Sequence, residues 1–317
     1  MPLPPVLAQL RFPVIAAPLF TISTPALVIA QCTAGIVGSF PALNARPESL
    51  LSEWIGQIKE ALAAWDRDHP DRPAAPFAVN QIVHRSNARL DHDLAVCVEH
   101  RVPIVITSLG ARPEVNEAVT GYGGVVMHDV INDRFAHKAI EKGATGLVAV
   151  AAGAGGHAGT LSPFALIQEI RAWFDGPLAL SGAIASGAAV LAAQAMGADF
   201  AYVGSAFIAT HEANAADGYK RALVDGTADG IVYTNLITGV HGNYLKSSLV
   251  AAGLDPDDLP VSDATKMDFG AGRKAWKDIW GSGQGIGIID GVVPARALVE
   301  RLHTEYDIAR RRLGLAG

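Results

Sequence analysis

The chain has 317 residues, of which 50% are hydrophobic and 18% are charged, and its formal net charge is −6. This composition permits a large buried core and argues against a disordered chain. The negative charge also argues against nucleic acid or an anionic membrane as the main partner, because binding to phosphates requires a basic face.

Neither a membrane span nor a disulfide is expected from the sequence. No apolar stretch approaches the roughly 20 residues that a spanning helix needs. The N-terminal segment MPLPPVLAQL lacks the basic and apolar regions of a secretory signal, so we expect a cytoplasmic protein. Cys32 and Cys97 lie in apolar segments of helical periodicity, and no C-x-x-C occurs. We therefore expect two buried free thiols and no zinc site.

Eight short apolar runs alternate along the chain with segments of helical periodicity. Because the runs are continuously apolar, they are typical of a parallel sheet covered on both faces. Eight strand–helix units predict a TIM (β/α)8 barrel, and a doubly wound open sheet is the main alternative. The predicted strands are 13–18, 35–40, 77–82, 103–108, 124–129, 146–152, 177–182 and 200–205. The predicted helices are 25–33, 47–64, 87–100, 112–119, 132–142, 163–174, 186–196 and 206–212.

The alternation stops after the eighth strand. Residues 213–282 contain a helical segment and a polar, turn-rich patch, so they predict a mainly helical insertion that lies over the barrel mouth as a substrate or lid domain. Residues 1–212 and 283–317 then form the barrel, which ends in a helix over 294–313.

The loops after the seventh and eighth strands carry a candidate phosphate site. In a TIM barrel the active site lies at the carboxyl ends of the strands, and these two loops commonly bind phosphate. Ser181, Gly182, Gly204 and Ser205 can direct hydroxyl and backbone N–H groups at an anion. Ordinary turns of small residues are the alternative. Asp129 is the only carboxylate at the strand ends, so no metal site is expected.

Residues 151–159 read AAGAGGHAG and follow the sixth strand. The run formally matches the G-x-G-x-x-G/A dinucleotide fingerprint, but the next strand does not end in the required carboxylate. We expect instead that the glycines let the backbone approach a flat ligand. His157 is suited to accept a proton near neutral pH. A cap on the helix that starts near Ser162 is its structural alternative.

Other polar residues lie at or near the mouth. His128 ends the fifth strand and either donates to a ligand or pairs with Asp129. Asn80 ends the third strand and either bonds a polar ring edge or caps a turn. His211 and His241 lie in or near the insertion and could line the mouth.

Several stretches resemble the nitronate monooxygenase (2-nitropropane dioxygenase) family of FMN-dependent TIM-barrel flavoproteins. They are AAGAGGHAG, SPFALIQEIR and the segment 178–213 containing LSGAIASG and YVGSAFIAT, with IAAPLF, FAVNQI and WGSGQGIGIID elsewhere. The resemblance implies FMN across the barrel mouth, with its phosphate on the two late loops and His157 as the base near the flavin. The FMN contacts it implies are Ala17, Pro18, Leu19, Asn80, Thr107, His128, Ala152, Gly155, Gly156, Ser181, Gly182, Ala183, Gly204, Ser205, Gln284 and Gly285.

The resemblance further implies oxidation of alkyl nitronates, extending to nitroalkanes, by O2 to carbonyl compounds and nitrite. The few charges at the strand ends suit a small, mostly apolar substrate, and a homodimer is compatible with this function. Departures from the family pattern concern the substrate: Leu19 replaces a frequent methionine, Val-Ala-Ala-Gly-Ala precedes the Gly-Gly-His motif, and Ser-Gly-Ala-Ile follows the seventh strand.

Two alternative functions stay open at this point. The first is an NAD(P)H-dependent reductase of quinones or enoyl thioesters on the same scaffold. It would need basic residues for a nucleotide or coenzyme A phosphate, for which Lys246, Lys266, Arg273 and Lys274 are candidates. The second is a non-catalytic binder of a phosphorylated metabolite.

Overall fold

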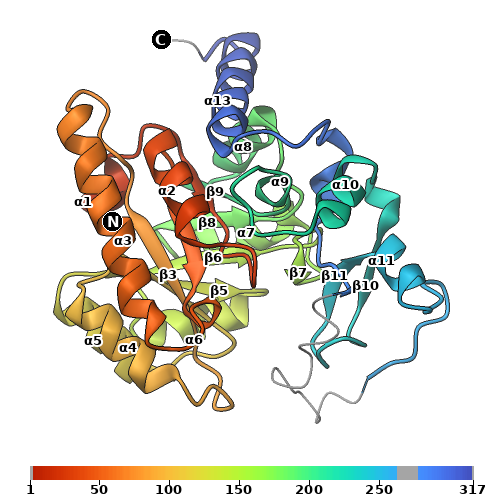
Figure 1. Cartoon of the computed structure of the whole chain (residues 1–317), viewed down its shortest axis with the longest axis horizontal. Coiled ribbons are helices and arrows are strands. Elements are labelled where there is room, and N and C mark those ends of the chain that lie inside the picture. The colour runs from red at the N-terminus through yellow and green to blue at the C-terminus, as the bar shows by residue number, and fades with distance from the viewer. Residues whose placement is uncertain (1–2, 263–277, 316–317) are drawn as a thin grey trace.

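The computed structural model describes residues 3–262 and 278–315. Its largest sheet has eight strands in the order β1-β9-β8-β6-β5-β4-β3-β2, and every pair is parallel. A parallel bridge between Ile15 and Val37 joins β1 to β2 and closes the sheet. The predicted TIM barrel is therefore confirmed (Figure 1). The strands are β1 (Val14–Ala16), β2 (Gly38–Pro41), β3 (Phe77–Ile82), β4 (Ile104–Ser108), β5 (Val125–Val130), β6 (Gly146–Val150), β8 (Leu178–Ser181) and β9 (Phe200–Val203).

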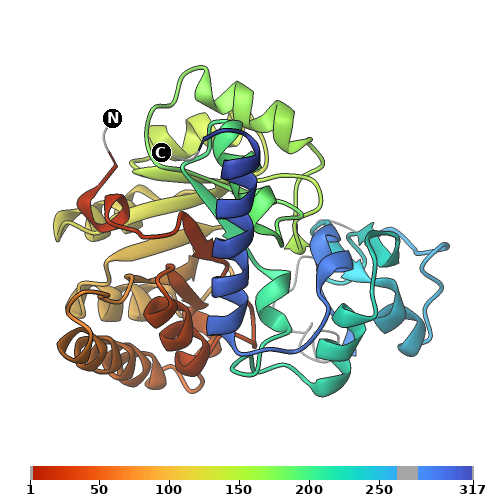
Figure 2. The same ribbon diagram turned by 90° about the horizontal axis from the view of Figure 1, so that it is seen from above.

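Helices follow the strands and cover the outside of the barrel (Figure 2). The long helix near the C-terminus, α13, packs on α8 and α2, so it helps to complete this layer. The helices of the barrel are α1 (Pro5–Ala8), α2 (Pro25–Ala34), η1 (Ala42–Asn44), α3 (Leu50–Asp68), α4 (Leu90–Glu99), α5 (Pro113–Gly121), α6 (Asp133–Glu141), α7 (Pro163–Arg171), α8 (Gly187–Ala195), α9 (Ser205–Ile208), η4 (Gln284–Ile288) and α13 (Ala295–Arg312).

The strands are continuously apolar because their two faces enter two different cores. Successive side chains of a strand point to opposite faces. On β5, Val125 and Met127 belong to the cluster inside the barrel, whereas Val126 and Val130 pack in the layer between strands and helices. β6 follows the same rule, with Val148 inside. This alternation decides which polar side chains at the strand ends face the barrel axis.

The region predicted as a helical insertion also contains strands. Its described part has α10 (Asp217–Val224), η2 (Ala228–Gly230), β10 (Ile231–Thr234), β11 (Gly242–Leu245) and α11 (Lys246–Ala251). β10 and β11 form an antiparallel hairpin, and β11 also pairs with β7 (Gly156–His157). The region lies to one side of the barrel (Figure 2). The division into a barrel domain and a 213–282 domain stays a prediction.

Both cysteines are buried free thiols, as expected. Cys32 lies on α2 and Cys97 on α4, and burial raises the pKa of each thiol to about 12. Neither sulfur is therefore a nucleophile at neutral pH. Within the described residues, no helix has the length and apolar character needed to cross a bilayer.

Candidate active site

A cavity of about 1060 Å3 opens at the carboxyl ends of the barrel strands. Small-molecule sites commonly range from about 300 to 1,000 Å3, so this one has room for a cofactor together with a substrate. Fourteen of the seventeen predicted site residues line it. They are Ala17, Pro18, Leu19, Asn80, His128, Gly155, Gly156, His157, Ser181, Gly182, Ala183, Gly204, Ser205 and Gly285.

The other three predicted contacts do not line the cavity. Thr107 faces His128, the carbonyl oxygen of Ala152 lies against Gly182, and Gln284 is exposed while its backbone N–H donates to Gly153. Of the candidates in the insertion, His241 lines the cavity. His211 is exposed on the surface and donates its backbone N–H to Val293.

The basic residues expected in the insertion do not meet the cavity where the structure describes them. Lys246 pairs with Asp257 at 3.8 Å and is absent from the cavity lining. Lys266, Arg273 and Lys274 lie outside the described residues. Across residues 3–262 and 278–315, no group of three or more His, Cys, Asp or Glu side chains is placed to hold a metal ion.

A polar layer caps the inside of the barrel beneath the cavity. Asn80 Nδ2 donates to Ser108 Oγ at 2.8 Å, and Ser108 Oγ donates to Asp129 Oδ2 at 2.5 Å. These residues lie near the ends of β3, β4 and β5, at positions whose side chains point to the barrel axis. Tyr202, on β9, is also part of the inner cluster and lines the cavity. Three neighbouring strand ends are therefore linked by hydrogen bonds below the mouth.

Two buried oxygen atoms of this layer have no hydrogen-bond partner among the described residues. They are Asp129 Oδ1 and the hydroxyl of Tyr202. Such groups cost free energy unless a ligand or water satisfies them. Burial raises the pKa of Asp129 to about 7, although its bond from Ser108 opposes the shift. The sequence analysis did not assign Ser108, Asp129 or Tyr202 to the site. The alternation of side chains along each strand could have found them, because it directs them to the barrel axis as it does Asn80.

His128 faces the opposite way from Asp129, because the two are adjacent on β5. Its Nδ1 lies 2.6 Å from Thr107 Oγ1, and its side chain is buried. Burial, with the nearby charge of Lys142, lowers the pKa of His128 to about 4, so the imidazole is neutral at neutral pH. His128 does not pair with Asp129, which was one of its two predicted roles.

His157 is held by the insertion. Its strand β7 pairs with β11, where Gly242 lies opposite His157. The ring Nε2 lies 2.9 Å from Thr238 Oγ1. Thr238 Oγ1 donates to Val240 O and accepts from Val240 N. Burial lowers the pKa of His157 to about 4, which keeps the ring neutral.

Further bonds from the insertion fix the loop around His157. The Tyr233 hydroxyl donates to Ala158 O at 2.9 Å, and Asn243 Nδ2 donates to Ala154 O at 2.7 Å. Thr238, Tyr233 and Asn243 were not predicted as site residues. No local motif marks them, because their role depends on a strand pairing across more than 70 residues.

The loops after β8 and β9 present bare backbone to the cavity. Gly182 has φ 143°, and a Cβ there would lie 2.7 Å from Ala152 O, so only glycine fits. Ser205 Oγ accepts from Gly283 N at 2.9 Å, which ties the loop after β9 to the segment before η4. With Ser181 and Gly204, these loops form a small, uncharged cradle suited to an anion bound by N–H and hydroxyl groups.

Known proteins resemble the chain along most of its length. The family model for nitronate monooxygenase matches residues 5–305. A nitronate monooxygenase of Paraburkholderia phytofirmans is 28% identical over 278 residues, which cover 77% of this chain and 76% of the relative. The structure of nitroalkane oxidase from Streptomyces ansochromogenes has a TM-score of 0.82 at 24% identity, covering 97% of this chain and 99% of that one.

FabK from Thermotoga maritima also shares the fold, with a TM-score of 0.78 at 22% identity over 98% of this chain and 96% of that one. This likeness bears on architecture alone. The family match, in contrast, covers nearly the whole chain, including the β7 histidine and both late loops. The chain therefore belongs to the nitronate monooxygenase family, whose members are flavin-dependent oxidoreductases acting on nitronates.

Proposed function

We propose that this chain uses FMN and O2 to oxidise alkyl nitronates, and nitroalkanes after proton removal, to carbonyl compounds and nitrite. The observation that carries the proposal is the setting of His157. It is a neutral imidazole, fixed by Thr238, in a cavity to which the loops after β6, β8 and β9 contribute mostly glycine, alanine and serine. A neutral imidazole can accept a proton, and a small apolar wall leaves space for a flat ring beside it.

The site has features that suit a bound flavin. The orphaned Asp129 Oδ1 and Tyr202 hydroxyl can bond to the polar edge of an isoalloxazine ring. Ser181, Gly182, Gly204 and Ser205 can hold the phosphate. The glycines of 153–156 permit close approach of the ring. When bound, FMN would supply the electron acceptor that passes electrons on to O2.

The residues of the chain then position the substrate and move one proton. In the tautomer whose Nε2–H donates to Thr238 Oγ1, Nδ1 of His157 accepts the α-proton of a nitroalkane. A preformed nitronate has already lost this proton, so it needs only to be bound. The side chains of Tyr219 and Trp280, stacked at 5.0 Å, form part of the insertion side of the cavity and exclude water there.

The test first identifies the bound cofactor and then measures the reaction. The purified protein should show a flavin spectrum, and heat release followed by chromatography should give FMN rather than FAD. Adding a preformed nitronate under air should consume O2 and release nitrite. A flavin-containing protein that yields neither nitrite nor O2 uptake with any alkyl nitronate would overturn the proposal. Rapid anaerobic bleaching by NADH or NADPH would favour the reductase alternative instead.

A further inference from the structure

One part of the cavity wall is apolar and comes from three separate segments of the chain. The loop after β1, the helix α9 and the insertion contribute to it. We call it the apolar lobe and define it as Leu19, Phe20, Ile22, Ile208, Tyr219 and Trp280. Ile22, Ile208 and Tyr219 line the cavity although they are only 6%, 2% and 8% exposed. The lobe is therefore a deep wall of the cavity and not a patch of the outer surface.

The loop after β1 is held from both sides. Asn44, in η1, donates from Nδ2 to Leu19 O at 3.0 Å and accepts from Thr21 N at 2.8 Å. Asn214, at the start of the insertion, donates its backbone N–H to Ile22 O at 3.1 Å and its side-chain amide to Thr21 O at 3.0 Å. These bonds fix the apolar side chains of the loop against the insertion.

Tyr219 and Trp280 form the aromatic part of the lobe, and both are anchored. Their rings stack with centroids 5.0 Å apart and 7° between the planes. The Tyr219 hydroxyl donates to Gly281 O. Trp280 donates its backbone N–H to Ser248 Oγ at 3.0 Å, and its carbonyl oxygen accepts from Leu245 N at 2.8 Å. The aromatic wall is therefore preorganised, so that little conformational entropy is lost when a ligand packs on it.

The aromatic pair lies next to the strand that carries the proposed base. Gly281 follows Trp280 in the chain, and a Cβ on Gly281 would lie 3.5 Å from Gly156 Cα. Gly156 and His157 together form β7. In a nitronate, the organic group is attached to the carbon that His157 would deprotonate in the parent nitroalkane. That group therefore has the apolar lobe within its reach.

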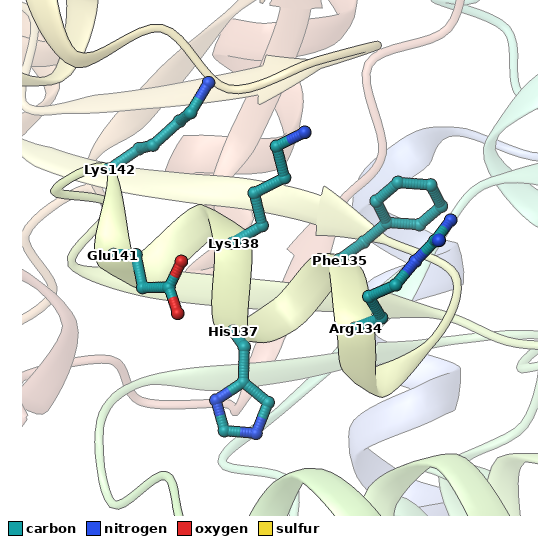
Figure 3. Close-up of a pocket in the computed structure, with 6 residues that line it drawn as sticks. All are labelled: Arg134, Phe135, His137, Lys138, Glu141 and Lys142. Atoms are coloured by element: carbon teal, nitrogen blue, oxygen red, sulfur yellow. The ribbon is translucent and has the colours of Figure 1, made fainter.

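The lysines at the mouth lie across the barrel from the loop after β1. In the closed sheet, β5 is four strands away from β1 in either direction. Lys138 and Lys142 line the cavity from the helix after β5, and they project from the same side of α6 (Figure 3). Arg46 borders the lobe, but its guanidinium lies over the Phe20 ring, 5.4 Å from the centroid. Since the faces of aromatic rings carry partial negative charge, the lobe suits an uncharged group and not the anionic end of a substrate.

We propose that the apolar lobe binds an aryl group, so that the preferred substrates of this chain are arylalkyl nitronates and not short-chain ones. The inference rests on the proposed function and deepens it, because it assigns the organic part of the nitronate. An aryl ring can pack edge-to-face or offset against Tyr219 and Trp280, which adds to the free energy gained from burial. A short-chain nitronate would leave the same apolar surface in contact with water.

The test measures the binding of unreactive carboxylates to the flavin-loaded protein by calorimetry. A carboxylate is planar and spreads one negative charge over two oxygens, as a nitronate does. Phenylacetate should bind with a Kd at least about tenfold below that of acetate, equivalent to roughly 1.4 kcal/mol. Both probes carry the same charge, so attraction by the basic side chains at the mouth cancels in the ratio of their Kd values.

Two variants from different segments of the lobe test its role. Trp280→Leu and Phe20→Ala should each lower the ratio at least about threefold, because each removes aromatic surface from the wall. Trp65→Leu is the matched control. Trp65 is also half-buried and stacks on a neighbouring ring, His69, at 3.6 Å, but it lies on α3 and is not among the lining residues. It should leave the ratio within about twofold, well below the tenfold that 1.4 kcal/mol represents.

Circular dichroism checks that each variant is folded. The proposal is overturned if phenylacetate binds no more tightly than acetate, or if both lobe variants keep the ratio of the unmodified chain. Loss of flavin from a folded Trp280→Leu protein would also overturn it, because the lobe would then hold the cofactor. Binding needs no turnover, so these outcomes are separate from success or failure of nitronate oxidation. Where the chain does oxidise nitronates, kcat/KM for 2-phenylethyl nitronate should exceed that for ethyl nitronate at least about tenfold.

Discussion

The mouth of the barrel has two unlike sides. The loops after β6, β8 and β9 are built of glycine, alanine and serine, and they approach a ligand with backbone groups. The loops after β2 to β5 line the cavity with long cationic side chains, which are Arg46, Arg85, Arg112, Lys138 and Lys142. The first side is braced by the insertion through β7, Thr238 and Asn243, whereas the cationic side chains extend from the barrel itself.

The two sides are suited to different tasks: one to holding a reacting group in place, the other to recognising a ligand. A proton acceptor, the role that we propose for His157, must be held rigidly, and His157 lies in a strand pairing with its ring bonded to Thr238. Long cationic side chains tolerate variation in the position of a phosphate, and they act over a longer range. The long motifs AAGAGGHAG and 178–213 lie on the rigid side, whereas FAVNQI forms β3 on the other side. Substitutions on the two sides should therefore have different consequences.

The largest effect is expected on the rigid side. His157→Asn should reduce kcat/KM for a neutral nitroalkane by about 10²- to 10⁴-fold, the usual contribution of a general base. Turnover of the preformed nitronate should fall far less, because no proton is removed. Since the pKa of His157 is lowered to about 4, nitroalkane turnover should persist through neutral pH and decline only as the pH approaches 4. An equal loss of turnover with the nitroalkane and the nitronate would show that His157 is not the base.

The next largest effect concerns the pH dependence of stability, which we expect to depend on Asp129 in the polar layer beneath the cavity. The pKa of Asp129 is raised to about 7, against about 3.9 in an unfolded chain. The stability it contributes is fully present below about pH 4 and is lost as the pH rises through about 7. At roughly 1.4 kcal/mol per pKa unit, the loss is at most about 4 kcal/mol. Urea unfolding at pH 5 and pH 8 should therefore show a decline that Asp129→Asn removes.

Asp71→Asn is the control for this measurement, because Asp71 is an exposed aspartate in the loop before β3. It should retain the pH dependence of the unmodified chain. If Asp129→Asn retained it as well, the carboxyl would be ionised in the folded protein at pH 5, and Asp129 could only accept a hydrogen bond from a flavin.

The same layer shows how much the sequence could predict. The barrel, its strands and most of the glycine side followed from apolar periodicity and the position of each strand end. His128 and Asp129 both line the cavity, but only Asp129 points to the barrel axis, and the alternation of side chains along β5 could have predicted this difference. Thr238 could not be predicted, since it meets His157 only through the pairing of β7 with β11. Such contacts depend on tertiary structure and not on local pattern.

A smaller effect should follow from filling the glycine cradle. Gly182→Ala places a Cβ 2.7 Å from Ala152 O at φ 143°, which costs about 1–3 kcal/mol of strain. The loop should shift, and FMN retained after gel filtration should fall. Gly56→Ala is the control, because nothing lies within 4 Å of a Cβ at that helical position. Unchanged flavin content in Gly182→Ala would contradict a phosphate site at this loop.

The smallest expected effect tests whether bracing by the insertion matters for catalysis. Thr238→Val keeps the shape of the side chain but removes the oxygen that lies 2.9 Å from His157 Nε2. We expect kcat for a nitroalkane to fall about tenfold, corresponding to roughly 1.4 kcal/mol, with little change in KM or in nitronate turnover. Thr238→Ser should restore most of the rate because it restores the hydroxyl. Thr238 also bonds to Val240, so loss of the local turn would lower turnover of both substrates. A selective loss on the nitroalkane, rescued by serine, is therefore the result that assigns Thr238 to positioning the base.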